Sequence, residues 1–581
     1  MGSHSSAGEA GRGIAGAVLA CVGLFLAALA PRLHGLDYLL PSVSEPDNAY
    51  AVQPRLISGE LPEGERHPFY GKYPHLISHL VLAIPWREGA TSHAPGDGLE
   101  VQLRRASSHT LRARLVVAVL GALCAPATFL LARAFLPAGW SLVAGALVAS
   151  SLLHFYSSQE ARPHAAVATT SLLAVLAALA VVRRPALASY VLAGMAAAVA
   201  IGTLHNGVAV LPALPVAHLL RAEPRRKVAH LYLAVAILLA AAAFPAWYPY
   251  LEFRGPAGRI EGGWLDVGGH RVELNFDGSG FRTMLAALAG YDPILFGLTA
   301  AGLAWALVSL ARGSRSLGTR AMGPRARDLA VVASYALPYT IVLGLYAGTF
   351  PRFVVPAIPY LAVLSAAALH RLSRATGARP WASSALVLAA LALPFAVVAK
   401  LSHLRGEPDT LEQAARHLEK HARRDDRILV WPGVELPLFQ DRVALEWNAR
   451  EVRSPHVYLW TNHLLGAETI GDGAGGYRTL LMPVFGGSFW KDLEGDPREA
   501  VSQLDADLVV CVDLIGRGPP PKLTLVRGVM AETGELVARF AAWRSRERLY
   551  PLAYHLDPFA FTSVLRAQAV GPVVEIYRMG E

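Results

Sequence analysis

Residues 13–31, GIAGAVLACVGLFLAALAP, form an apolar block without a single charged side chain. A helix needs about twenty such residues to cross roughly 30 Å of hydrocarbon. Similar blocks recur along the chain, and we count about eleven of them by this length criterion. They lie near 13–31, 111–134, 140–157, 164–182, 186–203, 206–221, 228–247, 283–311, 328–347, 353–370 and 382–399. The sequence therefore predicts an α-helical polytopic membrane protein.

The composition fits a membrane protein that ends in a more polar domain. Of the 581 residues, 53% are hydrophobic and only 17% are charged, which is unusual for a soluble chain. Hydropathy falls after Lys400, and Asp409-Thr410-Leu411-Glu412 opens a capped helix that we expect to reach Arg424. Strands are expected near 427–431, 479–484, 507–513, 522–527, 535–543 and 572–578, with a helix near 496–504. We therefore expect a transmembrane domain over residues 1–400 and a soluble α/β domain over residues 401–581.

The formal net charge of +9 reflects basic residues that fill alternate loops. These residues are Arg183, Arg184, Arg221, Arg225, Arg226, Lys227, Arg312, Arg315, Arg320, Arg325, Arg327, Arg371, Arg374 and Arg379. With a cytoplasmic N-terminus, the predicted spans put all of them on the cytoplasmic face of the inner membrane, as the positive-inside rule requires. The loops 32–110 and 251–282 and residues 401–581 are then extracytoplasmic. The charge is a topology signal, so we expect membrane lipids and no nucleic acid as partners.

The first outer segment, residues 32–110, is too polar to span a bilayer. Within it, residues 48–58 and 75–86 alternate apolar and polar side chains, as short helices lying in the membrane interface do. The Gly-rich stretch 87–110 is expected to be a loop. In the 251–282 loop, paired glycines and apolar–polar alternation predict a small β-hairpin or ordered loop.

An acidic pair, Glu45 and Asp47, follows the first span. Asp47 precedes a helical pattern and could simply cap that helix by accepting backbone N–H bonds. A carboxylate at the lipid–water boundary is also a candidate general base, which would take a proton from an attacking hydroxyl. The two roles are compatible, because burial and neighbouring cations set the pKa of a carboxylate. Asn48 and Tyr50, in the same stretch, are further candidates for substrate binding.

Arg352 opens a late predicted span on the outer face. An arginine in this position commonly holds a helix end at the interface, with its charged head in water. The guanidinium also matches phosphate oxygens in a two-point fork and is permanently charged. Because the predicted topology puts Arg352 on the same face as Asp47, we expect Arg352 to bind the phosphate of a substrate.

Further polar candidates fall on outer loops between the predicted spans. They are Glu160, Arg162 and His164 in one loop, His205 and Asn206 in the next, and Tyr70, Lys72, Tyr73 and His75 in the first outer segment. The Glu160–Arg162 pair fits either an ion pair or a solvated turn, and His205-Asn206 fits either a helix cap or a contact to phosphate or sugar. Their convergence on one face suits a site shared by a lipid-borne substrate and a water-borne acceptor.

Three stretches resemble the polyprenol-phosphate-dependent glycosyltransferases of the GT-C class, particularly the protein O-mannosyltransferase and lipid A aminoarabinose transferase superfamily. They are Pro46-Asp47-Asn48-Ala49-Tyr50 continuing to Tyr73-Pro74, the loop Ser157 to Pro163, and the segment Arg352 to Pro359. The resemblance covers residues 1–400 and implies a GT-C-like fold. It also implies inverting transfer of a sugar from a polyprenyl-phosphate donor to a hydroxyl on a protein, lipid or glycan. In this reading Asp47 is the base and Arg352 a ligand of the donor phosphate.

Three positions depart from the family's pattern. Asn48 stands where the family commonly has Glu, His164 where it often has Asp, and His205-Asn206 where a Lys-Tyr type pair is found. Such changes indicate an altered substrate or a lost activity. Because the implied base and phosphate ligand both remain, we expect an active enzyme with an altered substrate.

Two other classes of protein stay open. A transporter or flippase of a lipid-linked glycan would carry charged residues near the bilayer midplane and helices broken in repeated halves. A catalytically inactive assembly protein would use residues 401–581 to bind a partner. The three cysteines and the dispersed carboxylates show no metal-type spacing, so neither a metal nor a cofactor is expected.

Overall fold

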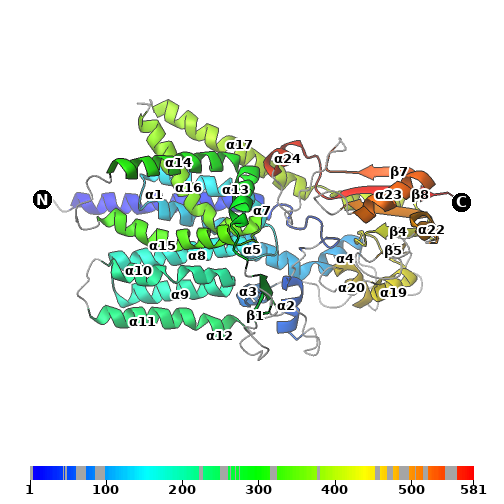
Figure 1. Ribbon diagram of the computed structural model, residues 1–581, viewed down its shortest axis with the longest axis horizontal. Coiled ribbons are helices and arrows are strands. Elements are labelled where there is room, and N and C mark those ends of the chain that lie inside the picture. The colour runs from blue at the N-terminus through cyan, green and yellow to red at the C-terminus, as the bar shows by residue number, and fades with distance from the viewer. Residues whose placement is uncertain are drawn as a thin grey trace. The chain divides into compact units, whose positions relative to one another are not determined.

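The chain forms two compact units, which Figure 1 shows in a computed structural model. Unit 1 comprises Met1–Leu33, Leu56–Leu82 and Ala113–Ala399, and unit 2 comprises His34–Arg55, Ala83–Arg112 and Lys400–Glu581. Parts of the first outer loop thus group with the C-terminal residues. The structure describes residues 4–43, 45, 49–59, 73–85, 98–221, 227–248, 260–261, 264–267, 270–273, 275–313, 323–375, 380–451, 458–466, 476–482, 496–503, 505–513, 521–543 and 559–580.

Unit 1 is dominated by apolar helices (Figure 1). They are α1 (His4–Leu33), α3 (Leu76–Ala83), α5 (Ser108–Ala132), α6 (Ala138–Ala149), α7 (Leu152–Ser158), α8 (His164–Arg183), α9 (Leu187–Thr203), α10 (Ala213–Leu219), α11 (Val228–Ala241), α12 (Ala243–Trp247), α13 (Ser279–Tyr291), α14 (Pro293–Gly313), α15 (Pro324–Leu345), α16 (Ile358–Ala375) and α17 (Pro380–Gly406), with 3₁₀ helices η1 (His205–Val210) and η4 (Pro351–Ala357). The 251–282 loop holds β1 (Ile260–Glu261), β2 (Trp264–Val267) and β3 (His270–Glu273), which pair antiparallel and confirm the predicted hairpin.

The described residues contain seven stretches that are long and apolar enough to cross a membrane. The helices α6 and α7, bent by 56°, give an eighth if they count as one span. Two shorter apolar helices, Leu187–Thr203 and Pro293–Val308, overlap further predicted spans. The chain is therefore a multi-pass membrane protein, with fewer full-length spans in its described part than the sequence suggested.

Three predicted spans are wrong as single helices, and one of them, residues 140–157, is the bent pair α6 and α7. Residues 283–311 break at Asp292, which has φ −131° and ψ 58°, because a residue that precedes a proline is disfavoured in the helical region. The Asp292 carboxylate accepts hydrogen bonds of 2.7 and 3.3 Å from two backbone amides at the start of α7. Residues 206–221 form η1 and then the short α10, since Pro212 lacks the N–H that a continuous helix needs there.

Small residues let the helices of unit 1 approach closely, as is common in membranes. A Cβ atom added to Gly194 of α9 would lie 2.6 Å from the carbonyl oxygen of Ala236 in α11. A Cβ added to Gly145 of α6 would similarly lie 2.9 Å from the carbonyl oxygen of Ala125 in α5. These glycines therefore set the spacing between neighbouring helices.

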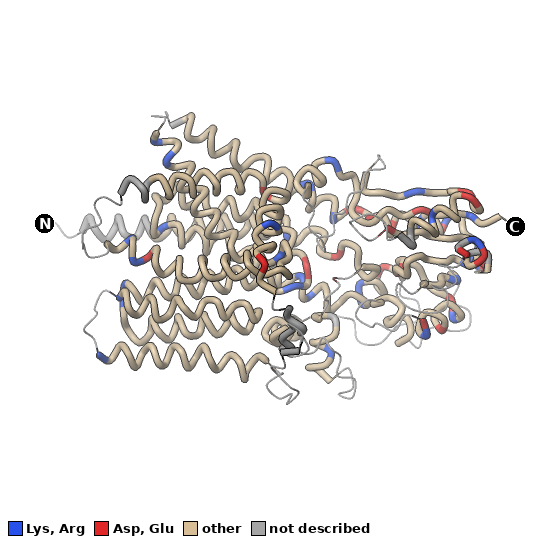
Figure 2. The backbone as a smooth tube through the Cα atoms, in the orientation of Figure 1, with Lys and Arg blue, Asp and Glu red and all other residues tan. Residues whose placement is uncertain are grey.

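Lys and Arg residues gather at one end of unit 1 (Figure 2). Arg183, at the end of α8, pairs with Asp328, near the start of α15, over 2.7 Å. This ion pair brings the basic loops around residues 183–184 and 325–327 to the same end of the helices. These two basic loops, which are far apart in the sequence, therefore lie at the same end of the helices, as their alternation along the sequence predicts.

Unit 2 is built on a five-stranded mixed sheet with the order β5-β4-β6-β8-β7 (Figure 1). Its strands are β4 (Arg427–Trp431), β5 (Arg478–Leu481), β6 (Leu508–Asp513), β7 (Gly534–Phe540) and β8 (Val573–Met579). Strand β4 is parallel to β5 and β6, and β8 is antiparallel to β6 and β7. Its helices are α2 (Ala49–Ile57), α4 (Leu99–Ala106), α18 (Thr410–His421), α19 (Arg442–Glu451), α20 (Leu459–Gly466), α22 (Pro497–Ser502), α23 (Pro521–Thr533) and α24 (Ala560–Arg566). The α/β class is confirmed.

The structure corrects two local predictions in unit 2. Residues 522–527, expected as a strand, lie in α23, because Val526, Val529 and Met530 follow helical spacing and pack into the core of the sheet. The expected loop 87–110 is helical from Leu99, since Leu99, Leu103 and Ala106 of α4 form an apolar stripe against Trp460.

Candidate functional site

One end of unit 1 brings together four residues that the sequence singled out: Arg162, His164, His205 and Arg352, here named the basic cluster. Helix α8, which His164 begins, packs against η4, which holds Arg352, and against η1, which His205 begins. Arg162 lies in the turn between α7 and α8, and His164 begins α8. His205 begins η1, and Arg352 lies in η4. Residues from three separate segments of the sequence therefore converge.

The Arg352 side chain lies against two aromatic rings. Its guanidinium carbon lies 4.2 Å from the ring centre of Phe350 and 5.2 Å from that of Phe353. Arginine stacks well on aromatic faces and keeps its donors in the plane of the guanidinium. Arg352 is half-buried, so its orientation is restrained while part of the side chain stays accessible.

His164 is 2% exposed, and its ring stacks on Phe353 with the ring centres 5.4 Å apart. Its Nδ1 atom is buried and has no hydrogen-bond partner among the described residues. A buried polar nitrogen without a partner is costly to the folded state. This nitrogen could accept a hydrogen bond from a protonated acidic group of a ligand. If the nitrogen carries the proton, it could donate one to an ionised acidic group.

Glu160 and Arg162 form a buried ion pair whose nearest atoms are 3.7 Å apart. Their side chains are only 4% and 3% exposed. This resolves the sequence alternatives in favour of an ion pair over a solvated turn. The carboxylate compensates part of the cost of burying the guanidinium, so Glu160 acts as a support for Arg162.

Sequence reasoning missed Arg32, a buried arginine that supports this end of unit 1. Arg32, which is fully buried, donates to the Ala28 carbonyl at 2.6 Å and contacts His154 Nδ1 at 3.2 Å. The Gln159 side chain donates to the Arg32 carbonyl at 3.1 Å, which ties the turn before Arg162 to the end of α1. The only signal in the sequence was an arginine directly after an apolar span.

The remaining candidates are placed separately. Tyr73 and His75 are buried in unit 1, where the His75 amide donates to the Trp247 carbonyl at 2.9 Å. Glu45 and Tyr50 are buried in unit 2, at 1% and 0% exposure. Four further candidates, Asp47, Asn48, Tyr70 and Lys72, lie outside the described residues.

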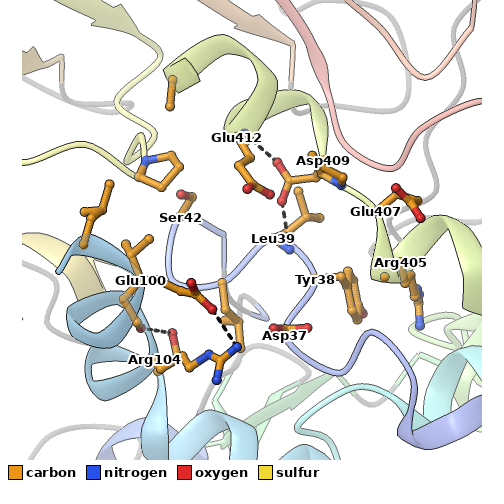
Figure 3. Close-up of a pocket in the computed structure, with 18 of the residues that line it drawn as sticks. Asp37, Tyr38, Leu39, Ser42, Glu100, Arg104, Arg405, Glu407, Asp409 and Glu412 are labelled. Carbon is orange, nitrogen blue, oxygen red and sulfur yellow. Dashed lines mark hydrogen bonds and ion pairs between the residues drawn. The ribbon is translucent and has the colours of Figure 1, made fainter. Parts of the chain in front are cut away.

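Unit 2 contains a cavity of about 590 Å³, shown in Figure 3. Its charged lining residues are Asp37, Glu100, Arg104, Arg405, Glu407, Asp409, Glu412, Arg416 and Glu419. Several are already engaged, since Glu100 pairs with Arg104 and Glu412 with Arg416. Tyr38 lies beneath the Arg405 guanidinium, 3.9 Å from its carbon. In the described part of the chain, no group of three or more His, Cys, Asp or Glu side chains has the geometry to hold a metal ion.

No protein-family model matches the chain, and no curated protein matches it. Among solved structures, it is similar to ArnT from Cupriavidus metallidurans bound to undecaprenyl phosphate, with 16% identity, a TM-score of 0.48, and coverage of 89% of this chain and 96% of that one. It is also similar to the oligosaccharyltransferase AglB from Archaeoglobus fulgidus in complex with an inhibitory peptide and a dolichol-phosphate, with 13% identity, a TM-score of 0.41, and coverage of 89% and 72%. Both of these proteins are GT-C polyprenol-phosphate-dependent glycosyltransferases, the class that the sequence motifs resemble.

Proposed function

We propose that this chain is a membrane glycosyltransferase that moves a sugar from a polyprenyl-phosphate donor to a hydroxyl acceptor on the extracytoplasmic face. The observation that carries the proposal is the basic cluster, in which the buried His164 ring and the Arg352 guanidinium both lie against the ring of Phe353. The permanent charge of Arg352 favours a phosphate, and its guanidinium offers the two-point donor geometry that phosphate oxygens accept. The three motif resemblances supply the reaction class.

In the proposed reaction, the acceptor oxygen attacks the anomeric carbon while the bond from that carbon to the phosphate oxygen breaks. The bonding electron pair leaves with the polyprenyl phosphate, and the configuration at the anomeric carbon inverts. Charge on the departing phosphate is where the basic cluster would act, because preorganised donors lower the barrier most where charge develops. The acceptor proton goes to Asp47, which the motif resemblance assigns as base.

The position of the basic cluster favours a transferase over a transporter. His164 is the first residue of α8 and Arg352 the second of η4, so these two side chains lie at the ends of helices. A transport pathway would instead place charged residues along the middle of the spans. The fixed packing of Arg352 against two aromatic rings also suits a site that holds one group in place.

The proposal is tested with purified full-length protein, a panel of polyprenyl-phosphate sugars and a panel of hydroxyl acceptors, scoring release of polyprenyl phosphate. We expect release from one donor class, and inversion at the anomeric carbon of the product. Asp47→Asn should abolish release and leave donor binding intact, because the amide cannot take the proton. Asp425→Asn, at an exposed carboxylate of unit 2, is the matched control and should leave the rate unchanged.

Two outcomes would contradict these assignments separately. If Asp47→Asn keeps a rate near that of the wild type, Asp47 is not the base. If no donor of the panel releases its phosphate and none binds, the transferase proposal fails.

A further inference from the structure

Two hydrogen bonds connect η1 to η4 through α15. The Tyr339 hydroxyl of α15 donates to the backbone carbonyl of Phe353 at 2.9 Å. The side-chain amide of Asn206 in η1 donates to the same hydroxyl oxygen at 3.3 Å. The elements at the two ends of this chain of bonds carry His205 and Arg352, which both belong to the basic cluster.

The direction of the two bonds follows from the chemistry of the tyrosine hydroxyl. It has one proton, which goes to the Phe353 carbonyl, because a carbonyl can only accept. The hydroxyl oxygen must therefore accept from Asn206, which fixes the orientation of that amide. The Asn206 Oδ1 atom is then buried without a partner among the described residues.

Phe353 is the residue on which both phosphate-ligand candidates rest. Its ring stacks on His164, with the ring centres 5.4 Å apart, and lies 5.2 Å from the guanidinium carbon of Arg352. A shift of Phe353 would therefore move His164 and Arg352 relative to each other. The bond from Tyr339 holds the backbone of this shared support.

We propose that Tyr339 is a positioning residue that keeps His164 and Arg352 aligned on one phosphate, with Asn206 orienting the Tyr339 hydroxyl. The inference rests on the proposed function, since it concerns how the donor phosphate is held. Tyr339 is 5% exposed and acts through Phe353, so it does not itself touch the substrate. A hydroxyl in this place is otherwise unexplained by packing, because the ring stacks on Tyr335 with centres 5.6 Å apart and needs no hydroxyl to do so.

Tyr339→Phe removes the hydroxyl and leaves the ring packing in place, so it isolates the two hydrogen bonds. The experiment measures binding of polyprenyl phosphate to the purified full-length protein, together with KM and kcat for release of that phosphate from its sugar donor. We expect binding roughly tenfold weaker in Tyr339→Phe, because the loss of two buried hydrogen bonds behind the site releases the shared support of His164 and Arg352. KM should rise more than kcat falls. The thermal midpoint should fall by a few degrees, because the Phe353 carbonyl and the Asn206 amide each lose a hydrogen bond.

Tyr335→Phe is the matched control, one helical turn earlier on α15 and similarly buried at 1% exposure. It should bind polyprenyl phosphate as the wild type does. Asn206→Ala should weaken binding several-fold by itself and add little in the Tyr339→Phe background, because the chain of bonds is already broken there. If Tyr339→Phe does not fold, Asn206→Ala alone tests the proposal, because it removes the bond that orients the Tyr339 hydroxyl.

The outcomes separate this inference from the function on which it rests. If the wild type binds polyprenyl phosphate and Arg352→Ala weakens binding, but Tyr339→Phe and Asn206→Ala do not, the positioning role is wrong and the proposed function stands. Additive effects of Asn206→Ala and Tyr339→Phe would also overturn the connection between them. If the wild type binds no polyprenyl phosphate, both proposals fall together.

Discussion

The Asp409 carboxylate accepts a hydrogen bond of 3.1 Å from the backbone amide of Leu39, 370 positions earlier in the chain. The same side chain caps α18 by accepting from the amides of Leu411 at 2.8 Å and Glu412 at 2.9 Å. One carboxylate thus accepts hydrogen bonds from backbone amides at the start of a helix and from an amide in a distant segment of the first outer loop. This bond explains in part why His34–Arg55 belongs to the same compact unit as the C-terminal residues.

Asp409→Ala should destabilise unit 2 by about 2–3 kcal/mol, since it removes a helix cap and leaves the Leu39 amide without its acceptor. Thermal unfolding of the full-length protein, read by limited proteolysis of residues 401–581, measures the effect. Asp409→Asn should lose less stability, because its side-chain oxygen can still accept hydrogen bonds from the Leu411 and Glu412 amides. Asp425→Ala, at an exposed carboxylate nearby, is the control. An unchanged midpoint for Asp409→Ala would show that the two segments are held by other contacts.

The stability of unit 2 should depend on pH through Glu435, which accepts from the amides of Trp460 at 2.9 Å and Thr461 at 2.6 Å. Burial raises the pKa of Glu435 from 4.5 to about 7 despite these bonds. A pKa raised on folding means that the folded state holds the proton more tightly than the unfolded chain does. The contribution of Glu435 to the free energy of unfolding is therefore fully present below about pH 4.5 and is lost as the pH rises through about 7. The total loss is about 3 kcal/mol.

Glu435→Gln cannot titrate, so the difference in unfolding midpoint between this variant and the wild type should change across that pH window. Glu446→Gln, at a carboxylate whose side chain is 66% exposed, is the control and should follow the wild-type profile. A wild-type profile that stays parallel to that of Glu435→Gln from pH 4.5 to 7 would rule out the raised pKa.

How far the sequence reaches can be judged residue by residue. His164 and Arg352 could be singled out as candidates because each stands in a short motif at the edge of an apolar block, where a polar side chain is conspicuous. Tyr339 could not be singled out, because one tyrosine inside an apolar span changes neither the hydropathy nor the spacing of polar residues. Arg32 was missed because an arginine after a span normally reaches toward water, whereas here it is fully buried.

The fold shows the same division. Hydropathy found the helical blocks, and the strand pattern found most of the sheet in unit 2. The break at Asp292 was overlooked although Pro293 follows it in the sequence, because the apolar block continues through both residues. The hydrogen bonds between the Asp292 carboxylate and the distant helix α7 leave no trace in the sequence. The helix α23 was mistaken for a strand because Lys522-Leu523-Thr524-Leu525 alternate in polarity, while the spacing that buries Val526 and Met530 appears only over a longer window.

Helix packing in unit 1 gives a test of the fold that does not depend on function. Gly194→Ala would put a Cβ atom 2.6 Å from the Ala236 carbonyl oxygen, so α9 and α11 must move apart. We expect a loss of about 1–3 kcal/mol, the usual effect of overpacking, measured as a lower thermal midpoint in detergent. Gly23→Ala is the control, because nothing lies within 4 Å of the added Cβ in α1. Equal midpoints for the two variants would contradict the close approach of α9 and α11.

Arg352 offers the sharpest test of the proposed phosphate site. Arg352→Ala should weaken binding of polyprenyl phosphate by about 1.5–3 kcal/mol, the usual value of a hydrogen bond to a charged group. Arg352→Lys should recover only part of this, because an ammonium keeps the charge but loses the two-point fork and the stacking on Phe350. Binding is measured by titrating the purified protein with polyprenyl phosphate at fixed ionic strength, since exposed charge interactions weaken with salt.

Arg371→Ala is the matched control for that experiment. Arg371 also lies against an aromatic ring, with its guanidinium carbon 5.3 Å from the ring centre of Trp305. It stands near the C-terminal end of α16, whereas η4 precedes the N-terminal end of that helix. Its loss removes the same charge from unit 1 and should leave phosphate binding unchanged. If Arg371→Ala and Arg352→Ala weaken binding equally, the effect comes from total charge and Arg352 is an anchor at the membrane interface. A selective loss in Arg352→Ala, partly restored by lysine, identifies a phosphate ligand with a required geometry.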